Sequence, residues 1–170
     1  MGNSSCLEEA ITRLRMLSSQ PPSLKGQALR LLSGREYSRA ELERKLRPKE
    51  EAPGELAQAL DELTAKGFIS EQRVIESVIN RRSAKLGTAR IRQELQSKGL
   101  DRDAVSEAVA ALQTTELERA REVWRRKFDS KSDASQATPA ERSKQMRFLA
   151  TRGFGVEIIR RVVSGTFDEA

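Results

Sequence analysis

Histidine is absent from this 170-residue chain, and cysteine occurs only once, as Cys6. These absences exclude an internal disulfide, a Cys/His zinc site and a catalytic pair that uses histidine as its base. The sequence also lacks a Gly-rich phosphate loop, and Glu36, Glu41 and Glu43 neighbour cations or cap helices. We therefore expect a protein that is not an enzyme and needs no metal and no cofactor.

Long apolar runs and aromatic side chains are scarce as well. No segment approaches the roughly 18 apolar residues of a membrane span, and the N-terminus lacks the apolar core of a secretory signal. This predicts a cytoplasmic protein that does not enter the membrane. Aromatic residues make up 4% of the chain and charged residues 33%, a balance that favours exposed helices around modest cores and hence an elongated shape.

What the sequence does contain is a series of short apolar-periodic segments, each ended by glycine or proline. A nine-residue stretch starting at Ser38 aligns with one starting at Gly87 at a shift of 49 residues, so that Leu42 matches Ile91 and Leu46 matches Leu95. A period of about 50 residues is typical of helical repeat arrays. We predict an all-α, elongated tandem array of three three-helix repeats. Its parts are an N-terminal arm (1–23) and repeats at 24–69, 70–113 and 114–165.

Helix boundaries are marked by capping signals. Capping boxes are predicted at Ser38, Thr115 and Thr138, each with glutamate three residues later. The pattern Leu-x-x-(Lys/Arg)-Gly-(Phe/Leu) occurs three times, with its glycine at 67, 99 and 153. This pattern ends a helix and turns the chain back onto its core, so Phe68 is expected to fold back. The arm contains one further amphipathic segment, with Leu7, Ile11, Leu14 and Leu17 at helical spacing.

Positive charge is concentrated in the C-terminal two thirds of the chain. Residues 1–72 carry eleven cations and eleven anions, so the net charge of +6 arises entirely from residues 73–170. A helix spanning 74–85 would place Arg81 and Lys85 on one face. This distribution predicts a basic surface for an anionic partner. The candidate contact residues are Arg81, Arg82, Lys85, Arg90, Arg92, Arg121, Arg125, Arg126, Arg147, Arg152, Arg160 and Arg161.

Trp124 and Phe128 could suggest a platform for stacking bases. They are four residues apart on one apolar stripe with Leu117 and Ala120, which favours packing in a core. With so few other aromatic residues, a stacking site for single strands is not expected.

Three segments resemble the RecX family, bacterial regulators of the RecA recombinase. They are A28-L-R-L-L-S-G-R-E-Y-S-R-A-E-L-E-R-K-L46, R90-I-R-Q-E-L-Q-S-K-G-L100 and R147-F-L-A-T-R-G-F-G-V-E-I-I159. The resemblance covers about residues 25–163. It implies a protein of tandem three-helix repeats that binds RecA filaments on DNA and inhibits strand exchange and ATPase activity.

Two other functions are compatible with the residues alone. Capped three-helix units with a basic face could bind nucleic acid directly, through the DNA phosphate backbone. A pure scaffold would bind neither DNA nor a filament. We expect the RecA filament to be the main partner, DNA binding to be weak in its absence, and the protein to be a monomer that acts as a wedge in the filament groove.

Overall fold

The structure is a computed structural model that describes residues 23–128 and 138–165. Within these ranges the chain forms nine α-helices and one short 3-10 helix, and no strand. The all-α prediction is therefore confirmed. The amphipathic segment predicted at residues 7–17 lies outside the described residues.

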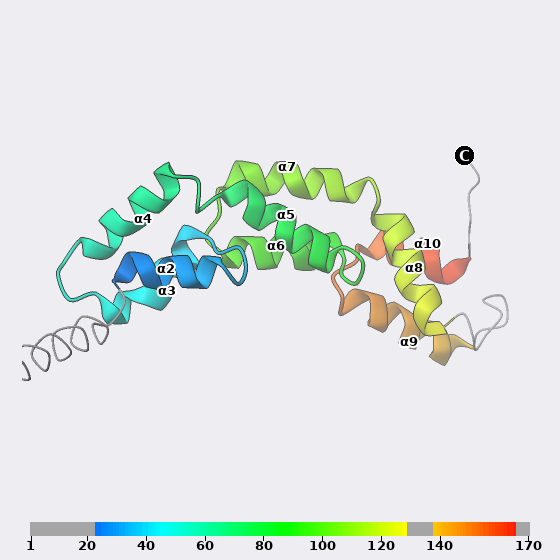
Figure 1. Cartoon of the computed structure of the whole chain (residues 1–170). Coiled ribbons are helices and arrows are strands. Elements are labelled where there is room, and N and C mark those ends of the chain that lie inside the picture. The colour runs from blue at the N-terminus through cyan, green and yellow to red at the C-terminus, as the bar shows by residue number, and fades with distance from the viewer. Residues whose placement is uncertain (1–22, 129–137, 166–170) are drawn as a thin grey trace, which may run out of the picture.

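The helices form three bundles arranged in a row, which makes the molecule elongated (Figure 1). The first unit consists of α2 (Leu24–Leu32), α3 (Arg39–Leu46), the 3-10 helix η1 (Arg47–Lys49) and α4 (Glu55–Ala65). The second unit consists of α5 (Glu71–Arg82), α6 (Thr88–Ser97) and α7 (Arg102–Gln113). The third unit consists of α8 (Glu116–Phe128), α9 (Pro139–Ala150) and α10 (Val156–Ser164).

Each unit closes its apolar stripes on a core of its own. Leu42, Leu60 and Leu63 are fully buried in the first core, whereas Ile91, Leu95 and Val109 are fully buried in the second. The third core contains Leu149, Trp124 and Phe154, among others. Three small cores in place of one large core explain why so few aromatic residues suffice for 170 residues.

The predicted capping boxes form at two of the three sites. Ser38 and Glu41 cap α3, and Thr138 and Glu141 cap α9. The box predicted at Thr115 was wrong. Its hydroxyl donates to the carbonyl of Leu112 and accepts from Arg119, and Glu118 instead forms an ion pair with Arg121. Nearby charged side chains thus compete successfully for both members of the box.

The prediction that Phe68 folds back was also wrong. The N–H groups of Gly67 and Phe68 do bond to the carbonyls of Thr64 and Leu63, as in a glycine-terminated helix end. However, Phe68 is 48% exposed and the next residue, Ile69, enters the core in its place. At the two other copies of the pattern, the corresponding residues Leu100 and Phe154 are buried.

The first junction joins the N-terminus of α3 to the C-terminus of α6. Ser38 is buried and its hydroxyl donates to the carbonyl of Lys98. The Lys98 ammonium, which is also buried, lies 2.8 Å from a carboxylate oxygen of Glu41. A Cβ placed on Gly99 would lie 2.8 Å from the Cβ of Ala40, so the two helix ends are in close contact. Most of the interactions at the first junction are therefore made by side chains.

The second junction joins the N-terminus of α6 to the C-terminus of α9, mainly through the backbone. The N–H of Gly87 donates to the carbonyl of Arg152 at 2.9 Å, and that of Ala89 donates to the carbonyl of Gly153 at 3.2 Å. A Cβ placed on Gly87 would meet the backbone of Gly153 and Phe154 at 2.3 Å. Only glycine allows this approach.

Two side chains from α8 complete the second junction. The N-cap position of α6 is Gly87, which has no capping side chain. Glu116 takes that role from the third unit, because its carboxylate accepts the Thr88 N–H at 2.9 Å. Arg119 donates to the carbonyls of Ser83, Leu86 and Leu112 and to the hydroxyls of Thr88 and Thr115.

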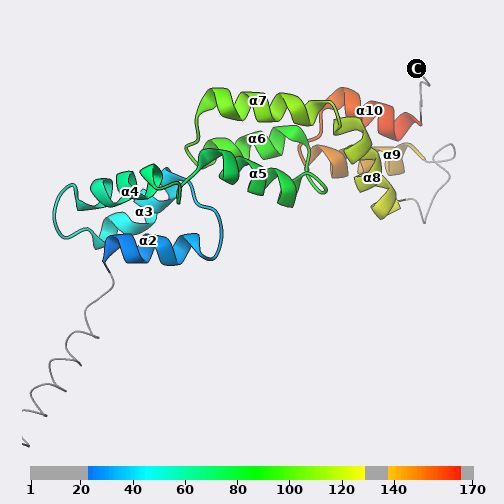
Figure 2. The same cartoon turned by 45° about the horizontal axis from the view of Figure 1, so that its top comes forward.

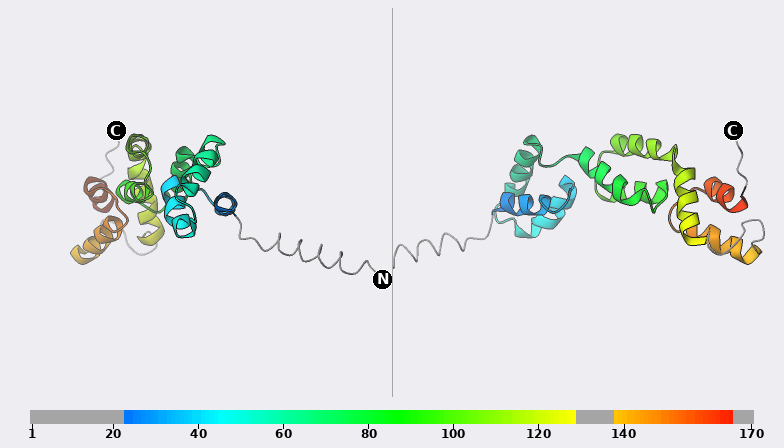
Figure 3. Two further views of the ribbon diagram at one scale, coloured as in Figure 1. Left: turned by 90° about the vertical axis from the view of Figure 1, so that its left-hand side faces the viewer. Right: turned by 45° about the vertical axis from the view of Figure 1, so that its right-hand side comes forward.

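The second helices of the three units are therefore connected end to end, in the order α9, α6, α3. The same bundles appear in a row when the molecule is turned about either axis (Figures 2 and 3). Because of this arrangement, the three copies of the glycine pattern do not have the same structural role. Gly99 and Gly153 lie at junctions, whereas a Cβ placed on Gly67 would have no neighbour within 4 Å.

Candidate binding surface

The twelve cations predicted to bind a partner are distributed over the second and third units. Ten of them are exposed, and Arg121 and Arg152 are half-buried. The twelve cations also differ in whether the charged group already has an intramolecular partner, such as a carboxylate or an aromatic ring.

In the second unit, the predicted face shared by Arg81 and Lys85 does not form. Helix α5 ends at Arg82, so Lys85 lies in the turn that follows it. Arg119 binds the carbonyls of Ser83 and Leu86 just beyond this helix end, which fixes the turn. Arg81 donates to the carbonyl of Ser77, and Arg82 pairs with Glu94 at 2.9 Å.

Arg90 and Arg92 lie on either side of the fully buried Ile91, so α6 presents both to solvent. The first turn of α6 has no acidic residue. Arg90 lies in that turn, where the positive end of the helix dipole disfavours a cation. The charge of Arg90 is therefore unfavourable for the dipole of α6.

In the third unit, acidic neighbours occupy several of the predicted contacts. Arg126 pairs with Glu122 at 2.9 Å, and Arg160 pairs with Glu157 at 2.8 Å. These pairs are exposed, so a stronger anionic partner can displace the carboxylate at little cost. Arg121 pairs with Glu118 at 2.6 Å with its side chain only 19% exposed, which makes it a less accessible contact.

Arg152 also has an intramolecular partner. Its guanidinium lies 3.5 Å from the centre of the Phe148 ring and donates to the Phe148 carbonyl. Because its own carbonyl accepts the N–H of Gly87, Arg152 belongs to the second junction as well as to the predicted surface.

Six of the twelve cations are exposed and have neither an ion pair nor a hydrogen bond from the side chain within the described ranges. We call them the unpaired cations: Lys85, Arg90, Arg92, Arg125, Arg147 and Arg161. They come from the turn after α5 and from α6, α8, α9 and α10. Both C-terminal units therefore contribute to them.

Three charged residues with defined structural roles were missed by sequence reasoning. Lys98 counted toward the positive charge of residues 73–170, but it is buried in the first junction. Arg119 counted toward the same charge, but the second junction uses its guanidinium. Glu116 was not singled out at all. Nothing in their local sequence distinguishes them, because their partners lie in other units.

The aromatic residues of α8 belong to the third core, as predicted. Trp124 is buried, and its indole N–H donates to the amide oxygen of Gln145 at 3.1 Å. Phe128 packs edge-on against Phe148, with 5.1 Å between ring centres. Neither ring forms a stacking platform.

Residues 23–128 and 138–165 offer neither a metal site nor a membrane span. These residues contain no group of three or more acidic, cysteine or histidine side chains that could hold a metal ion. None of their helices is long and apolar enough to cross a membrane.

These features define a class: an elongated helical repeat protein whose three-helix units are joined through their second helices and whose last two units carry exposed cations. Residues 25–63, 70–109 and 114–163 match the first, second and third three-helix domains of RecX, respectively. The regulatory protein RecX of Leptothrix cholodnii is 50% identical over 149 residues, which are 87% of this chain and 92% of the relative. The chain belongs to the RecX family.

A second relative agrees with this assignment, and a solved structure agrees with the fold. The regulatory protein RecX of Ralstonia nicotianae is 45% identical over 88% of this chain and 91% of its own length. A crystal structure of RecX from Lactobacillus salivarius is similar in fold, with a TM-score of 0.69 and 20% identity. It covers 84% of this chain and 93% of that one. Both of these relatives are named regulatory proteins.

Proposed function

We propose that this protein binds RecA filaments on DNA and inhibits their recombinase, strand-exchange and ATPase activities. It acts without catalysis, as a wedge in the filament groove. The observation that carries this proposal is the set of unpaired cations on the second and third units of a chain that belongs to the RecX family. Family membership supplies the partner, and the cations supply a surface that a DNA-bound filament can attract.

The elongated shape supports a filament as the partner. Three units in a row can contact several neighbouring filament subunits at once. Weak contacts made by each unit then combine, because the first contact raises the effective concentration of the next. A monomer is sufficient for this mode of binding.

The chemistry of the cations supports a fast and salt-sensitive association. Charges near the edge of an interface mainly increase the rate of encounter, and salt screens them over about 8 Å at physiological ionic strength. The first unit carries balanced charge and contributes contact area and shape rather than attraction.

The alternative function is direct binding of nucleic acid by the basic helical units. The described residues of the second and third units include no exposed aromatic side chain, which argues for contacts with phosphate rather than with bases. If this alternative is correct, bare single-stranded DNA binds as well as RecA-coated DNA, and the affinity falls steeply with salt.

The test is the triple charge reversal Lys85→Glu/Arg90→Glu/Arg92→Glu. The variant should stay folded, because these side chains are exposed and have no partners within the described residues, and it should lose most of the inhibition of RecA ATPase activity. The measurement is the concentration that half-inhibits the ATPase, together with co-sedimentation on bare and on RecA-coated DNA at about 150 mM salt.

The matched control is Arg30→Glu/Arg47→Glu/Lys66→Glu, which reverses three exposed cations of the first unit. Both variants have the same net charge, so a difference between them reports on location. If the Lys85/Arg90/Arg92 variant inhibits at the wild-type concentration, these cations are not the working surface. Equal binding to bare and coated DNA would favour the alternative function.

A further inference from the structure

A groove of about 1070 Å³ runs along the first unit, between α2 on one side and α3 and η1 on the other. Its accessible apolar surface comes from Leu31 and Pro48, and beneath them lie Leu24 and Leu46, which are buried in the first core. Leu24 and Leu31 lie at opposite ends of α2, so the groove extends along nearly the whole helix. The groove lies outside the basic surface discussed above, and the proposed function makes no use of it.

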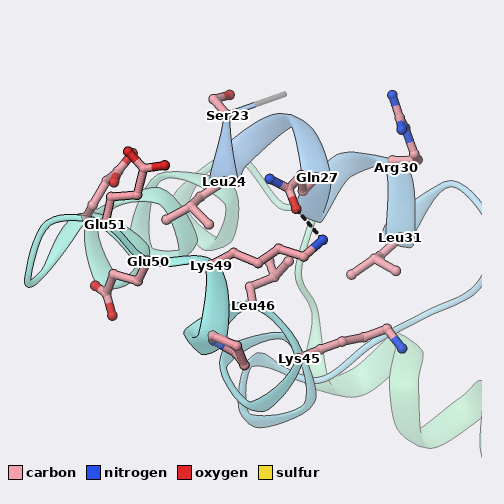
Figure 4. Close-up of a pocket in the computed structure, with 12 residues that line it drawn as sticks. Ser23, Leu24, Gln27, Arg30, Leu31, Lys45, Leu46, Lys49, Glu50 and Glu51 are labelled. Carbon is pink, nitrogen blue, oxygen red and sulfur yellow. Dashed lines mark hydrogen bonds between the residues drawn. The ribbon is translucent and has the colours of Figure 1, made fainter. Parts of the chain in front are cut away.

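The groove is polar along its rim, and its two ends carry opposite charges. Glu50 and Glu51 lie at the end near Leu24, where the described chain begins, and Arg30 and Lys45 lie at the other end (Figure 4). Between them Lys49 donates to the amide oxygen of Gln27 at 2.7 Å. This exposed bond contributes little free energy and does not hold the groove closed.

The N-terminal arm contains a segment with the matching pattern. Apolar residues at 7, 11, 14 and 17 share one face of a helix, and this helix would be about 16 Å long, close to the length of α2. Glu8 and Glu9 lie at its beginning, and Arg13 and Arg15 lie toward its end. Residues 18–22 connect it to the start of α2 and can span up to about 17 Å, which is enough to reverse the chain.

This connection fixes the direction in which the segment can lie. If residues 7–17 run antiparallel to α2, Arg13 and Arg15 come to the end that carries Glu50 and Glu51. Glu8 and Glu9 then come to the end that carries Arg30 and Lys45. The opposite direction would place like charges together and would require the linker to cross the full length of the groove.

We propose that this groove is the binding site for residues 7–17 of the same chain, which add a further helix to the first unit. The apolar face of the segment packs on Leu31 and Pro48, above the buried Leu24 and Leu46, and the charged ends fix its direction. The first unit therefore becomes a four-helix unit, unlike the other two.

The single native cysteine allows a direct test in the full chain. Cys6 immediately precedes the segment, so the proposal places it at the Arg30 end of the groove. In an Arg30→Cys variant, a short bis-maleimide should join the new thiol to Cys6 within one molecule. A matched Glu51→Cys variant carries its thiol at the other end, and an Arg161→Cys variant carries it on the third unit; all three positions are exposed.

The expected result is about tenfold more intramolecular cross-linking for Arg30→Cys than for either control, because docking raises the effective concentration of the thiols. Glu8→Lys/Glu9→Lys should reduce this yield, and adding Lys45→Glu should restore part of it. Circular dichroism checks that every variant is folded. Equal yields at the three positions would overturn the proposal. So would cross-linked dimers, which would show that a second copy occupies the groove.

Discussion

The two junctions have the same geometry but different chemistry. In each, the N-terminus of one second helix meets the C-terminus of the next, at equivalent positions of the repeat. The first is sealed by an ion pair and a hydroxyl, contributed by Lys98, Glu41 and Ser38. The second is sealed by backbone contact at Gly87 and Gly153. A repeat can therefore keep its spacing while exchanging side-chain bonds for backbone bonds.

The substitution with the largest expected effect on either junction is Gly87→Ala, which acts on the second junction. The new methyl group would meet backbone atoms at 2.3 Å, and backbone cannot move aside without opening the junction. We expect a loss of about 3 kcal/mol in the free energy of unfolding, at the upper end for overpacking, measured by urea denaturation.

Gly67→Ala is the matched control for this prediction. Gly67 has a positive φ of 73°, but a Cβ there meets nothing within 4 Å. Only the backbone conformation is penalised, at about 1 kcal/mol. If the two variants lose equal stability, the close approach at Gly87 is not a constraint on the fold.

A second comparison replaces one cation of each junction, the half-buried Arg119 or the buried Lys98, by methionine. Arg119→Met removes hydrogen bonds to three carbonyls and two hydroxyls and should lower the free energy of unfolding by about 3 kcal/mol. Lys98→Met should lower it by about 1 kcal/mol. The smaller loss follows because Glu41 keeps its bonds to Arg35 and to the Ser38 N–H.

Thermal and urea denaturation measure both variants. Arg119→Lys should rescue little of the loss, because one ammonium cannot reach acceptors that a planar guanidinium spans. Equal losses for the two methionine variants would show that the number of hydrogen bonds does not distinguish the junctions.

A further expected effect, as small as that of Lys98→Met, is the pH dependence of the first junction. Partial burial acts to raise the pKa of Glu41, but hydrogen bonds from Lys98, Ser38 and Arg35 outweigh it and hold the pKa below its usual range. A carboxyl with a lowered pKa stabilises the fold above its unfolded pKa near 4.3. This stabilisation is lost as the pH falls through the folded pKa.

We therefore expect the wild type to exceed Glu41→Gln in stability by about 1 kcal/mol at neutral pH, with the difference vanishing in acid. Denaturation at a series of pH values measures this. A difference that does not change with pH would mean that the charge of Glu41 contributes nothing to the junction.

The helices of each unit could be predicted well from the sequence, because local signals determine them. The apolar spacing of Leu42, Leu46, Ile91 and Leu95, together with glycine stops, determines where helices begin and end. The junctions could not be predicted, because Glu116 caps a helix whose first residue, Thr88, lies in another unit. Only the three-dimensional contact shows that its carboxylate replaces a missing capping residue.

The candidate surface was predicted in part for the same reason. Charge counting located the basic half of the molecule, and Arg90 and Arg92 are exposed as expected. Counting could not separate Lys98 and Arg119 from the surface cations, because the burial of Lys98 and the hydrogen bonds of Arg119 depend on residues far away in the sequence. It also placed Arg81 and Lys85 on one helix, which ends too early at Arg82.

The reversed order of the connected helices has a consequence for synthesis on the ribosome. The hydroxyl of Ser38 bonds to a carbonyl that is made 60 residues later, and Gly87 bonds to residue 152. The ribosome adds about 5–20 residues per second, so several seconds pass before the residues that complete each junction have been synthesised. Each three-helix core can form from its own residues during that interval. The nascent chain thus gains its long-range contacts last, one junction at a time, from the N-terminus onward.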